Sequence, residues 1–206
     1  MEQRTKEWFE ARRGKFTASQ IESLLGKITL KRTTDKINNY AMKKAGEMFF
    51  GLPEEETFFS KDVQRGIDLE PVAFAKFQAL KRLEFVEVTE SPFVAYNNHS
   101  GASPDGCLRT TNENLEIKCP TIETFNKLVL TGEINPKYFA QMQMQMLSTG
   151  AGATHFFNYV VHNDVEYHYT ILVDRCEDTI AELKERIDYA TEIKMQYFKT
   201  LQEKFD

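Results

Sequence analysis

Hydrophobic residues recur along this 206-residue chain in two patterns, one with the period of an α-helix and one with the period of a β-strand. Stretches with an apolar residue at every third or fourth position predict helices, whereas apolar–polar alternation and concentrations of β-branched and aromatic residues predict strands. The predicted helices are 5–13, 19–26, 31–50, 61–82, 122–130, 136–148 and 179–205. The predicted strands are 85–88, 93–96, 107–109, 115–118, 154–161 and 165–173. This order indicates an α/β protein with a central mixed β-sheet flanked by helices.

The long helices of this pattern shape the expected organisation of the chain. Residues 179–205 predict a long amphipathic C-terminal helix. Within the helix 61–82, Pro71 directly follows Glu70 and has no N–H to donate, so we expect a break or kink there. The chain is predicted to form a single domain, 1–206, with a helical N-terminal segment at 1–50, a core at 61–175 and the C-terminal helix at 177–206.

Charge is distributed unevenly along the chain. The formal net charge is −5, but residues 1–44 hold 11 basic and 5 acidic side chains, whereas residues 45–206 hold 15 and 26. The basic N-terminal part is compatible with a phosphate-binding surface and equally with a solvated charged face. Three cysteines without zinc-ligand spacing favour a reducing compartment. With no long apolar run and no signal segment, we expect a cytoplasmic protein that has no membrane partner.

The most informative candidate chemistry lies in the strand 115–118 and the strand 107–109 before it. The sequence Leu-Glu-Ile-Lys alternates apolar and charged residues, so on a strand Glu116 and Lys118 point to one face. Turn-forming residues between the two strands predict a hairpin. Pairing within this hairpin brings Asp105 beside Glu116, so two carboxylates and an ammonium group converge.

Two adjacent carboxylates repel each other unless a proton or a cation lies between them. Mg²⁺ prefers carboxylate, carbonyl and water oxygens, and it usually keeps several of its waters. A water bound to such an ion is more acidic, and Lys118 is placed to orient that water or to stabilise negative charge in a transition state. The same residues are compatible with a surface hairpin that carries an exposed ion pair, because such triplets are common in a highly charged chain.

Further blocks of residues, in the same order along the chain, resemble those of one enzyme family. The blocks are Trp8-x-x-x-Arg12-x-Gly14-x-x-Thr17-Ala18-Ser19, Gly66-x-x-x-Glu70, Glu90-Ser91-Pro92, Ser103-Pro104-Asp105-Gly106, Leu115-Glu116-Ile117-Lys118-Cys119-Pro120 and Tyr138-x-x-Gln141-x-Gln143. Over about residues 8–145 the chain resembles the phage lambda exonuclease group, the YqaJ-type viral recombinases of the PD-(D/E)xK nuclease superfamily. The resemblance implies a restriction-endonuclease-like α/β core.

The resemblance also implies magnesium-dependent hydrolysis of DNA phosphodiesters by two metal ions, with Mn²⁺ as a candidate substitute. Asp105 and Glu116 would be metal ligands, together with the main-chain carbonyl of Ile117. Glu70 would serve the second metal ion or the attacking water. Lys118 would activate or position that water.

Gln141 would help to hold the active-site groups, with Tyr138 beside it. On the helix 136–148, Gln141 and Gln145 share one face and Gln143 does not. At most two of the three glutamines can therefore act together.

The N-terminal block implies a site for the 5′-terminal phosphate of DNA. Arg12 would contact this phosphate, Ser19 and Ser103 would hydrogen-bond phosphates, and Trp8 would line the pocket. The chemistry of the guanidinium group supports this role, because an arginine fork pairs bidentately with a terminal phosphate. Arg12 is also compatible with an ordinary exposed arginine on a short helix.

The resemblance therefore implies an exonuclease that digests one strand of linear double-stranded DNA from 5′ to 3′ and leaves 3′ overhangs for phage-type recombination in a bacterial host. Family members are typically homotrimeric rings that work with a single-strand annealing protein. The resemblance therefore implies a homotrimer and an annealing partner. One alternative is an endonuclease or structure-specific resolvase on the same core, which would cut closed circular DNA. Another is a non-catalytic module that binds DNA ends.

Overall fold

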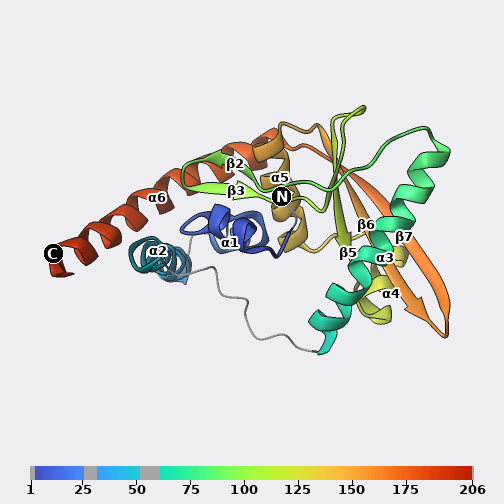
Figure 1. Cartoon of the computed structure of the whole chain (residues 1–206), viewed down its shortest axis with the longest axis horizontal. Coiled ribbons are helices and arrows are strands. Elements are labelled where there is room, and N and C mark those ends of the chain that lie inside the picture. The colour runs from blue at the N-terminus through green and yellow to red at the C-terminus, as the bar shows by residue number, and fades with distance from the viewer. Residues whose placement is uncertain (1–2, 26–31, 52–60, 206) are drawn as a thin grey trace.

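The computed structural model describes residues 3–25, 32–51 and 61–205, which form a mixed α/β fold (Figure 1). A four-stranded mixed sheet carries helices on both faces, and a smaller three-stranded sheet lies near the N-terminal helix. The long helix α6 (Glu177–Phe205) ends the described chain. The predicted fold class is confirmed. No helix within the described ranges combines the length and apolar content that a membrane span requires.

The larger sheet has the strand order β4-β5-β6-β7. Its central pair, β5 (Glu113–Lys118) and β6 (Ala153–His162), is parallel. The outer strands β4 (Gly106–Leu108) and β7 (Val165–Asp174) pair antiparallel with their neighbours. The two predicted hairpins, β4–β5 and β6–β7, are therefore confirmed.

The smaller sheet joins the N-terminal segment to the chain that precedes β4. Strand β1 (Phe16–Thr17) pairs parallel with β3 (Ser100–Ala102), and β3 pairs antiparallel with β2 (Val94–Asn97). Only β2 is predicted by the sequence, because β1 and β3 are too short to show an alternating pattern. This pairing fixes the N-terminal segment beside the loop that leads into the larger sheet.

The remaining elements are helices whose ends carry ordinary capping residues. The hydroxyl of Thr5 accepts a hydrogen bond from the Trp8 N–H at the start of the first helix, and Gly132 and Gly150 end two others at positive φ. Besides α6, the helices within the described ranges are α1 (Lys6–Arg12), the 3₁₀ helix η1 (Ala18–Ser23), α2 (Arg32–Phe50), α3 (Lys61–Leu83), α4 (Ile122–Thr131) and α5 (Pro136–Thr149).

Separate apolar clusters cover the two faces of the larger sheet. On one face Ala73 and Phe77 of α3 pack with Leu115 and Ile117 of β5. On the other face α4 and α5 contribute a second cluster, which includes Met142. Since successive side chains of a strand point to opposite faces, the residue between the two apolar positions of β5 points toward α5.

A third apolar cluster holds the N-terminal segment against α5 and α6. It contains Phe16 of β1, Ile37 of α2, Met144 of α5 and Ile187 of α6. Helix α5 thus has one side toward the larger sheet and another toward the N-terminal segment. A polar side chain on α5 can consequently reach either layer.

Of the break or kink predicted at Pro71, the break is wrong, because α3 runs from Lys61 to Leu83 with Pro71 inside it. Leu69 lies on the N-terminal side of the proline and Phe77 on its C-terminal side, and both pack in the same cluster against the sheet. A proline inside a helix removes one main-chain hydrogen bond. Packing on both sides of it keeps the helix continuous here.

The predicted strand 85–88 is also absent. Phe85 has a φ of 59° and is 97% exposed, and its N–H donates to the carbonyl of Arg82. This segment therefore ends α3 in a turn. Only Thr89 pairs with the sheet, through two main-chain hydrogen bonds with Cys107 of β4.

Candidate active site

Glu116 is buried on the face of β5 that points to α5, and three donors hold its carboxylate. Its side chain is only 1% exposed. Gln141 Nε2 donates to Oε1 at 2.7 Å, and Gln145 Nε2 donates to Oε2 at 2.5 Å. Lys118, two residues along the strand, forms an ion pair with Oε1. The predicted shared faces of Glu116 with Lys118 and of Gln141 with Gln145 are confirmed.

Asp105 lies next to Glu116 because of the register of the β4–β5 hairpin. The Asp105 N–H donates to the Leu115 carbonyl, and Asp105 Oδ2 accepts from the Ile117 N–H at 2.7 Å. The pKa of Asp105 is raised well above its ordinary value, first by burial and then by the negative charges of Glu116 and Glu70. The carboxyl groups of this site therefore repel one another.

Lys118 lies between the two carboxylates and an aromatic ring. Its ammonium nitrogen is 5.1 Å from the centre of the Tyr138 ring, a cation–π distance. Burial alone would lower the pKa of Lys118, but the Glu116 and Asp105 carboxylates outweigh it and raise this pKa. Lys118 is consequently a cation at neutral pH. We call Asp105, Glu116 and Lys118 the acid cluster.

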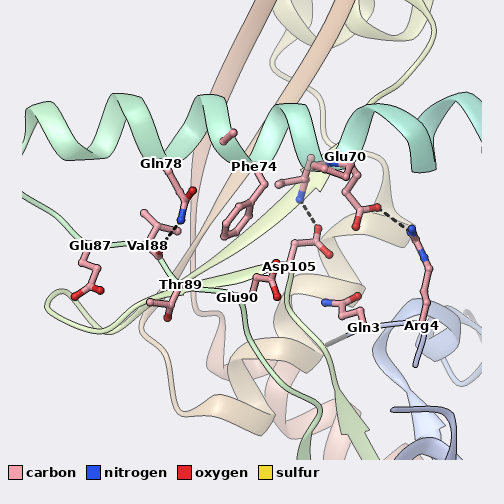
Figure 2. A pocket seen from close by; sticks show the side chains of 13 residues that line it. Gln3, Arg4, Glu70, Phe74, Gln78, Glu87, Val88, Thr89, Glu90 and Asp105 are labelled. Atoms are coloured by element: carbon pink, nitrogen blue, oxygen red, sulfur yellow. Dashed lines mark hydrogen bonds and ion pairs between the residues drawn. The ribbon is translucent and has the colours of Figure 1, made fainter. Parts of the chain in front are cut away.

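Glu70 of α3 lies across a pocket from the acid cluster. The pocket has a volume of about 780 Å³, and Asp105 and Ile117 line it together with Glu70 and Phe74. Figure 2 shows the side chains of Glu70 and Asp105 within this pocket. The Glu70 carboxylate accepts from Arg4 Nη2 at 3.0 Å. It is thus near enough to raise the pKa of Asp105, but it is held by a different partner.

The donor set of the acid cluster suits a hard divalent cation. Asp105 and Glu116 supply carboxylate oxygens, and the carbonyl of Ile117 lies on the same strand. Within residues 3–25, 32–51 and 61–205, no three His, Cys, Asp or Glu side chains gather as an ion-binding group. Mg²⁺ is usually held by one or two carboxylates, with waters and substrate phosphates completing the shell. The residues therefore fit one such ion, and Glu70, which lines the same pocket and pairs with Arg4 through Oε2, is the candidate ligand of a second.

The residues predicted to bind a 5′-phosphate also lie together. The Arg12 guanidinium carbon is 3.9 Å from the centre of the Trp8 ring, and the Arg12 side chain is largely buried. Its two terminal nitrogens each lie 3.5 Å from a hydroxyl, one of Ser103 and one of Ser19. Trp8 Nε1 donates to the Ser103 hydroxyl at 2.9 Å. We call these four residues the Arg12 cluster.

One short loop connects the two clusters. Ser103 belongs to the Arg12 cluster and Asp105 to the acid cluster, with Pro104 between them. Gln3 Nε2 donates to the Pro104 carbonyl at 2.9 Å, so the N-terminal arm is attached to the same loop. A phosphate bound at the Arg12 cluster would therefore lie near the acid cluster, because Ser103 and Asp105 are only two residues apart.

A model of the YqaJ-like viral recombinase domain matches residues 7–152, which are more than half of the chain and include both clusters. The chain belongs to the YqaJ-like viral recombinase domain family. The family resemblance predicted from the sequence is thus confirmed. A comparison with curated protein sequences gives no significant match.

Two solved structures of a bacterial enzyme resemble this YqaJ-like chain over nearly its whole length. The alkaline exonuclease LHK-Exo from Laribacter hongkongensis is 29% identical, with a TM-score of 0.82 and 97% of both chains covered. The structure of LHK-Exo in complex with dAMP is 28% identical, with a TM-score of 0.81. A phage-related exonuclease from Haemophilus somnus 129PT shares the fold at 18% identity, with a TM-score of 0.66 and coverage of 92% and 96%.

The structure brings most of the predicted site residues of this YqaJ-like domain together, in two groups. The acid cluster gathers with Ile117, Gln141 and Tyr138, and the Arg12 cluster contains the four residues predicted for a phosphate site. Glu70 reaches the pocket but not the acid cluster itself. No local pattern signals Arg4 or Gln3, because their partners are 66 and 101 residues away. Gln145, in contrast, is indicated by the sequence, because it shares a helix face with Gln141.

Proposed function

We propose that the protein is a metal-dependent 5′→3′ exonuclease that digests one strand of linear double-stranded DNA and leaves 3′ overhangs for recombination of the phage type. Membership of the YqaJ-like family and the likeness to LHK-Exo, which is named as an alkaline exonuclease, support a DNA exonuclease. The observation that carries the proposal is the position of Asp105 and Ser103 on one loop, which joins the acid cluster to the Arg12 cluster.

Asp105, Glu116 and the Ile117 carbonyl are the groups that would hold Mg²⁺ or Mn²⁺, and Glu70 is the candidate ligand of a second ion. An ion held by these groups would supply polarisation of the phosphate and a more acidic bound water. Gln141 and Gln145 hold the Glu116 carboxylate from two sides, which fixes the direction of its oxygens. Such outer contacts typically change metal affinity or activity 10- to 100-fold when removed, as an order of magnitude.

Lys118 contributes a positive charge on the same side as the carboxylates. As an ammonium group it donates hydrogen bonds only, so it would orient the attacking water and stabilise the charge that develops on the phosphate. The Tyr138 ring lies at cation–π distance and limits where the ammonium group can move.

The Arg12 cluster would select the end of the DNA. The Arg12 guanidinium is stacked on Trp8, and its terminal nitrogens lie beside the hydroxyls of Ser19 and Ser103. An arginine fork fixed in this way pairs bidentately with a terminal phosphate. The two hydroxyls can turn to donate to phosphate oxygens. A 5′-phosphorylated end is therefore the proposed substrate.

Digestion of labelled DNA tests the proposal. Linear duplex with 5′-phosphate ends should be degraded in Mg²⁺, with the 5′-labelled strand releasing its label first, and EDTA should stop the reaction. Duplex with 5′-hydroxyl ends should be degraded more slowly, and closed circular DNA should remain intact. Cutting of circular DNA would support an endonuclease instead. End binding without nucleotide release in any divalent metal would support a binding module.

The assembly and the cellular setting also belong to this proposal. A homotrimeric ring, a single-strand annealing partner and action in the cytoplasm of a bacterial host all follow from the family resemblance. Light scattering of the purified chain tests the first of these, because a trimer gives three times the 23.9 kDa mass of one chain. A monomer at working concentrations would contradict it.

A further inference from the structure

Arg4 lies in the pocket beside the acid cluster, where it pairs with an acid that is a candidate metal ligand. Its Nη2 is 3.0 Å from Glu70 Oε2, and the side chains of Arg4 and Glu70 are 40% and 32% exposed. Figure 2 shows Arg4 extending from the N-terminal arm toward Glu70, which comes from α3. An ion pair with this exposure contributes only about 0–1 kcal/mol, so other ligands can displace either partner.

The arm that carries Arg4 is held in place, and its backbone is unusual. Gln3 is hydrogen-bonded to the carbonyl of Pro104, immediately before Asp105. Thr5 caps α1 through the Trp8 N–H. Between these two attachments Arg4 has a φ of 64°, a left-handed conformation that is uncommon for residues other than glycine. Such a conformation persists where surrounding contacts impose it, so the contacts of Gln3 and Thr5 hold the backbone of Arg4 beside the pocket.

The charges around the pocket require compensation before DNA can approach. Of the thirteen described residues that line it, four are carboxylates and Arg4 is the only Lys or Arg. A DNA phosphate would be repelled by these carboxylates. Divalent ions reverse the local charge and at the same time take up carboxylate oxygens that would otherwise pair with cationic side chains.

We propose that Arg4 is an exchangeable counter-ion: it holds the Glu70 carboxylate while no divalent cation is bound, and it is released to a phosphate of the DNA end when a cation takes that carboxylate. The inference rests on the proposed function, because it requires a divalent ion and a DNA substrate. A guanidinium group makes stronger, bidentate contacts with phosphate than it makes here with Glu70, where one nitrogen donates at hydrogen-bond distance. Exchange of partners therefore favours the loaded complex.

Binding of the metal alone tests the first half of the exchange. Free Mn²⁺ is measured by electron paramagnetic resonance during titration of the full chain without DNA. Arg4→Gln should bind Mn²⁺ about 3- to 10-fold more tightly than wild type, because a competing cation has been removed. Arg4→Lys keeps the charge and should bind Mn²⁺ as wild type does. The matched control is Lys76→Gln, which removes an ion pair with Glu166 of similar length and exposure and should change nothing.

Binding of a short 5′-phosphorylated duplex tests the second half. Fluorescence anisotropy is measured over a range of KCl concentrations in a Lys118→Ala background, so that the DNA is not digested. In Mg²⁺, Arg4→Gln should weaken binding about tenfold and reduce the slope of log Kd against log salt by about one, as expected for one lost phosphate contact. In EDTA the same substitution should have no effect, because Glu70 already occupies Arg4.

Two results would overturn the inference: equal Mn²⁺ affinity for Arg4→Gln and Lys76→Gln, or an Arg4→Gln effect on DNA binding that is the same in Mg²⁺ and in EDTA. If wild type digests DNA and either result is found, the role of Arg4 alone is wrong. If wild type neither binds Mn²⁺ nor digests DNA, the proposed function fails and this inference fails with it.

Discussion

The acid cluster and a second buried group of charges each contain an unbalanced charge, which is compensated differently in the two groups. The second group consists of Lys44, Glu47 and Lys194, which we call the closed ion cluster. Lys44 Nζ lies 3.0 Å from both oxygens of Glu47, and Lys194 Nζ donates to the Gly14 carbonyl at 2.7 Å. All three side chains are at most 4% exposed. The acid cluster has an excess of negative charge, and the closed ion cluster has an excess of positive charge.

The difference lies in what can relieve the excess. The acid cluster adjoins a pocket, so a cation from solution can enter. None of the closed ion cluster's members lines that pocket. Its excess positive charge is relieved when Lys194 loses a proton, as the pH rises through about 8. Burial, with the nearby charges of Lys15 and Lys44, lowers the pKa of Lys194 to about 8. Buried charge therefore does not by itself indicate a catalytic site; an uncompensated charge that faces a pocket does.

The closed ion cluster also has a structural role close to the Arg12 cluster. Gly14 has a φ of 65°, and its N–H donates to Glu47 while its carbonyl accepts from Lys194. A side chain at this position would collide with Met48 as well as strain the backbone. The cluster thus fixes the turn that directly follows α1 and Arg12.

Replacing Asp105 should give the largest effect and should break the acid cluster as a catalytic unit. Asp105→Asn should lower exonuclease activity by at least about 1000-fold, because a proposed ligand of the divalent ion is lost. Its free energy of unfolding should not fall, since the charge that is removed is repelled by Glu116 and Glu70. Nucleotide release and urea denaturation measure the two effects. The control is Glu87→Gln, in the same pocket, and equal losses in both variants would contradict the assignment.

Replacing Glu47 should affect the folded state and leave the chemistry intact. Glu47→Gln leaves Lys44 buried without its carboxylate partner and should lower the free energy of unfolding by about 3–5 kcal/mol. Activity per folded molecule, measured at low temperature, should stay within a few-fold of wild type. Glu166→Gln, at the exposed Lys76 pair, should cost less than about 1 kcal/mol. A catalytic loss in Glu47→Gln as large as that of Asp105→Asn would remove the distinction between the clusters.

The stability of the protein should rise with pH because of Lys194. In the unfolded chain this lysine binds its proton up to a pKa near 10.5, whereas in the folded protein it releases it near pH 8. Between these values the unfolded state holds more protons, so the free energy of unfolding increases with pH, by up to about 3 kcal/mol in total. Urea denaturation of wild type and of Lys194→Met, measured at about five pH values from 7.5 to 10.5, isolates this contribution. Parallel curves for the two proteins would contradict it.

The glutamines of α5 should show the smallest effects, and they separate the two roles on one helix. Gln145→Leu should lower activity about tenfold, because one of the donors that orient Glu116 is lost. Gln143 instead bonds the main chain at Asp174 and Cys176. Gln143→Leu should lower the free energy of unfolding by about 1–3 kcal/mol and leave activity unchanged. An activity loss in Gln143→Leu, with a stability loss alone in Gln145→Leu, would contradict these two roles.

Local alternation predicted the acid cluster correctly, whereas long-range pairings could not be read from the sequence. The period of two in 115–118 places Glu116 and Lys118 together whatever the rest of the fold does. The spacing of four between Gln141 and Gln145 does the same on a helix. The pair of Arg4 with Glu70, in contrast, depends on how the N-terminal arm meets α3, and no local pattern contains that information.

Tertiary packing overrode two local signals. The proline after Glu70 predicted a break or kink, but α3 does not break there, because its apolar face packs on the sheet on both sides of the proline. The apolar residues at 85–88 predicted a strand, but the turn after Leu83 leaves Phe85 exposed. In each case the apolar positions are visible in the sequence, but the surface against which they pack is set by the tertiary fold.

A crystal grown with Mn²⁺ and a short 5′-phosphorylated duplex would locate the metal, through its anomalous signal, and the DNA end in one experiment. We predict a metal peak in contact with Asp105, Glu116 and the Ile117 carbonyl, and the terminal phosphate at the Arg12 guanidinium. Metal bound elsewhere, with Glu116 still enclosed by Lys118, Gln141 and Gln145 alone, would contradict the account.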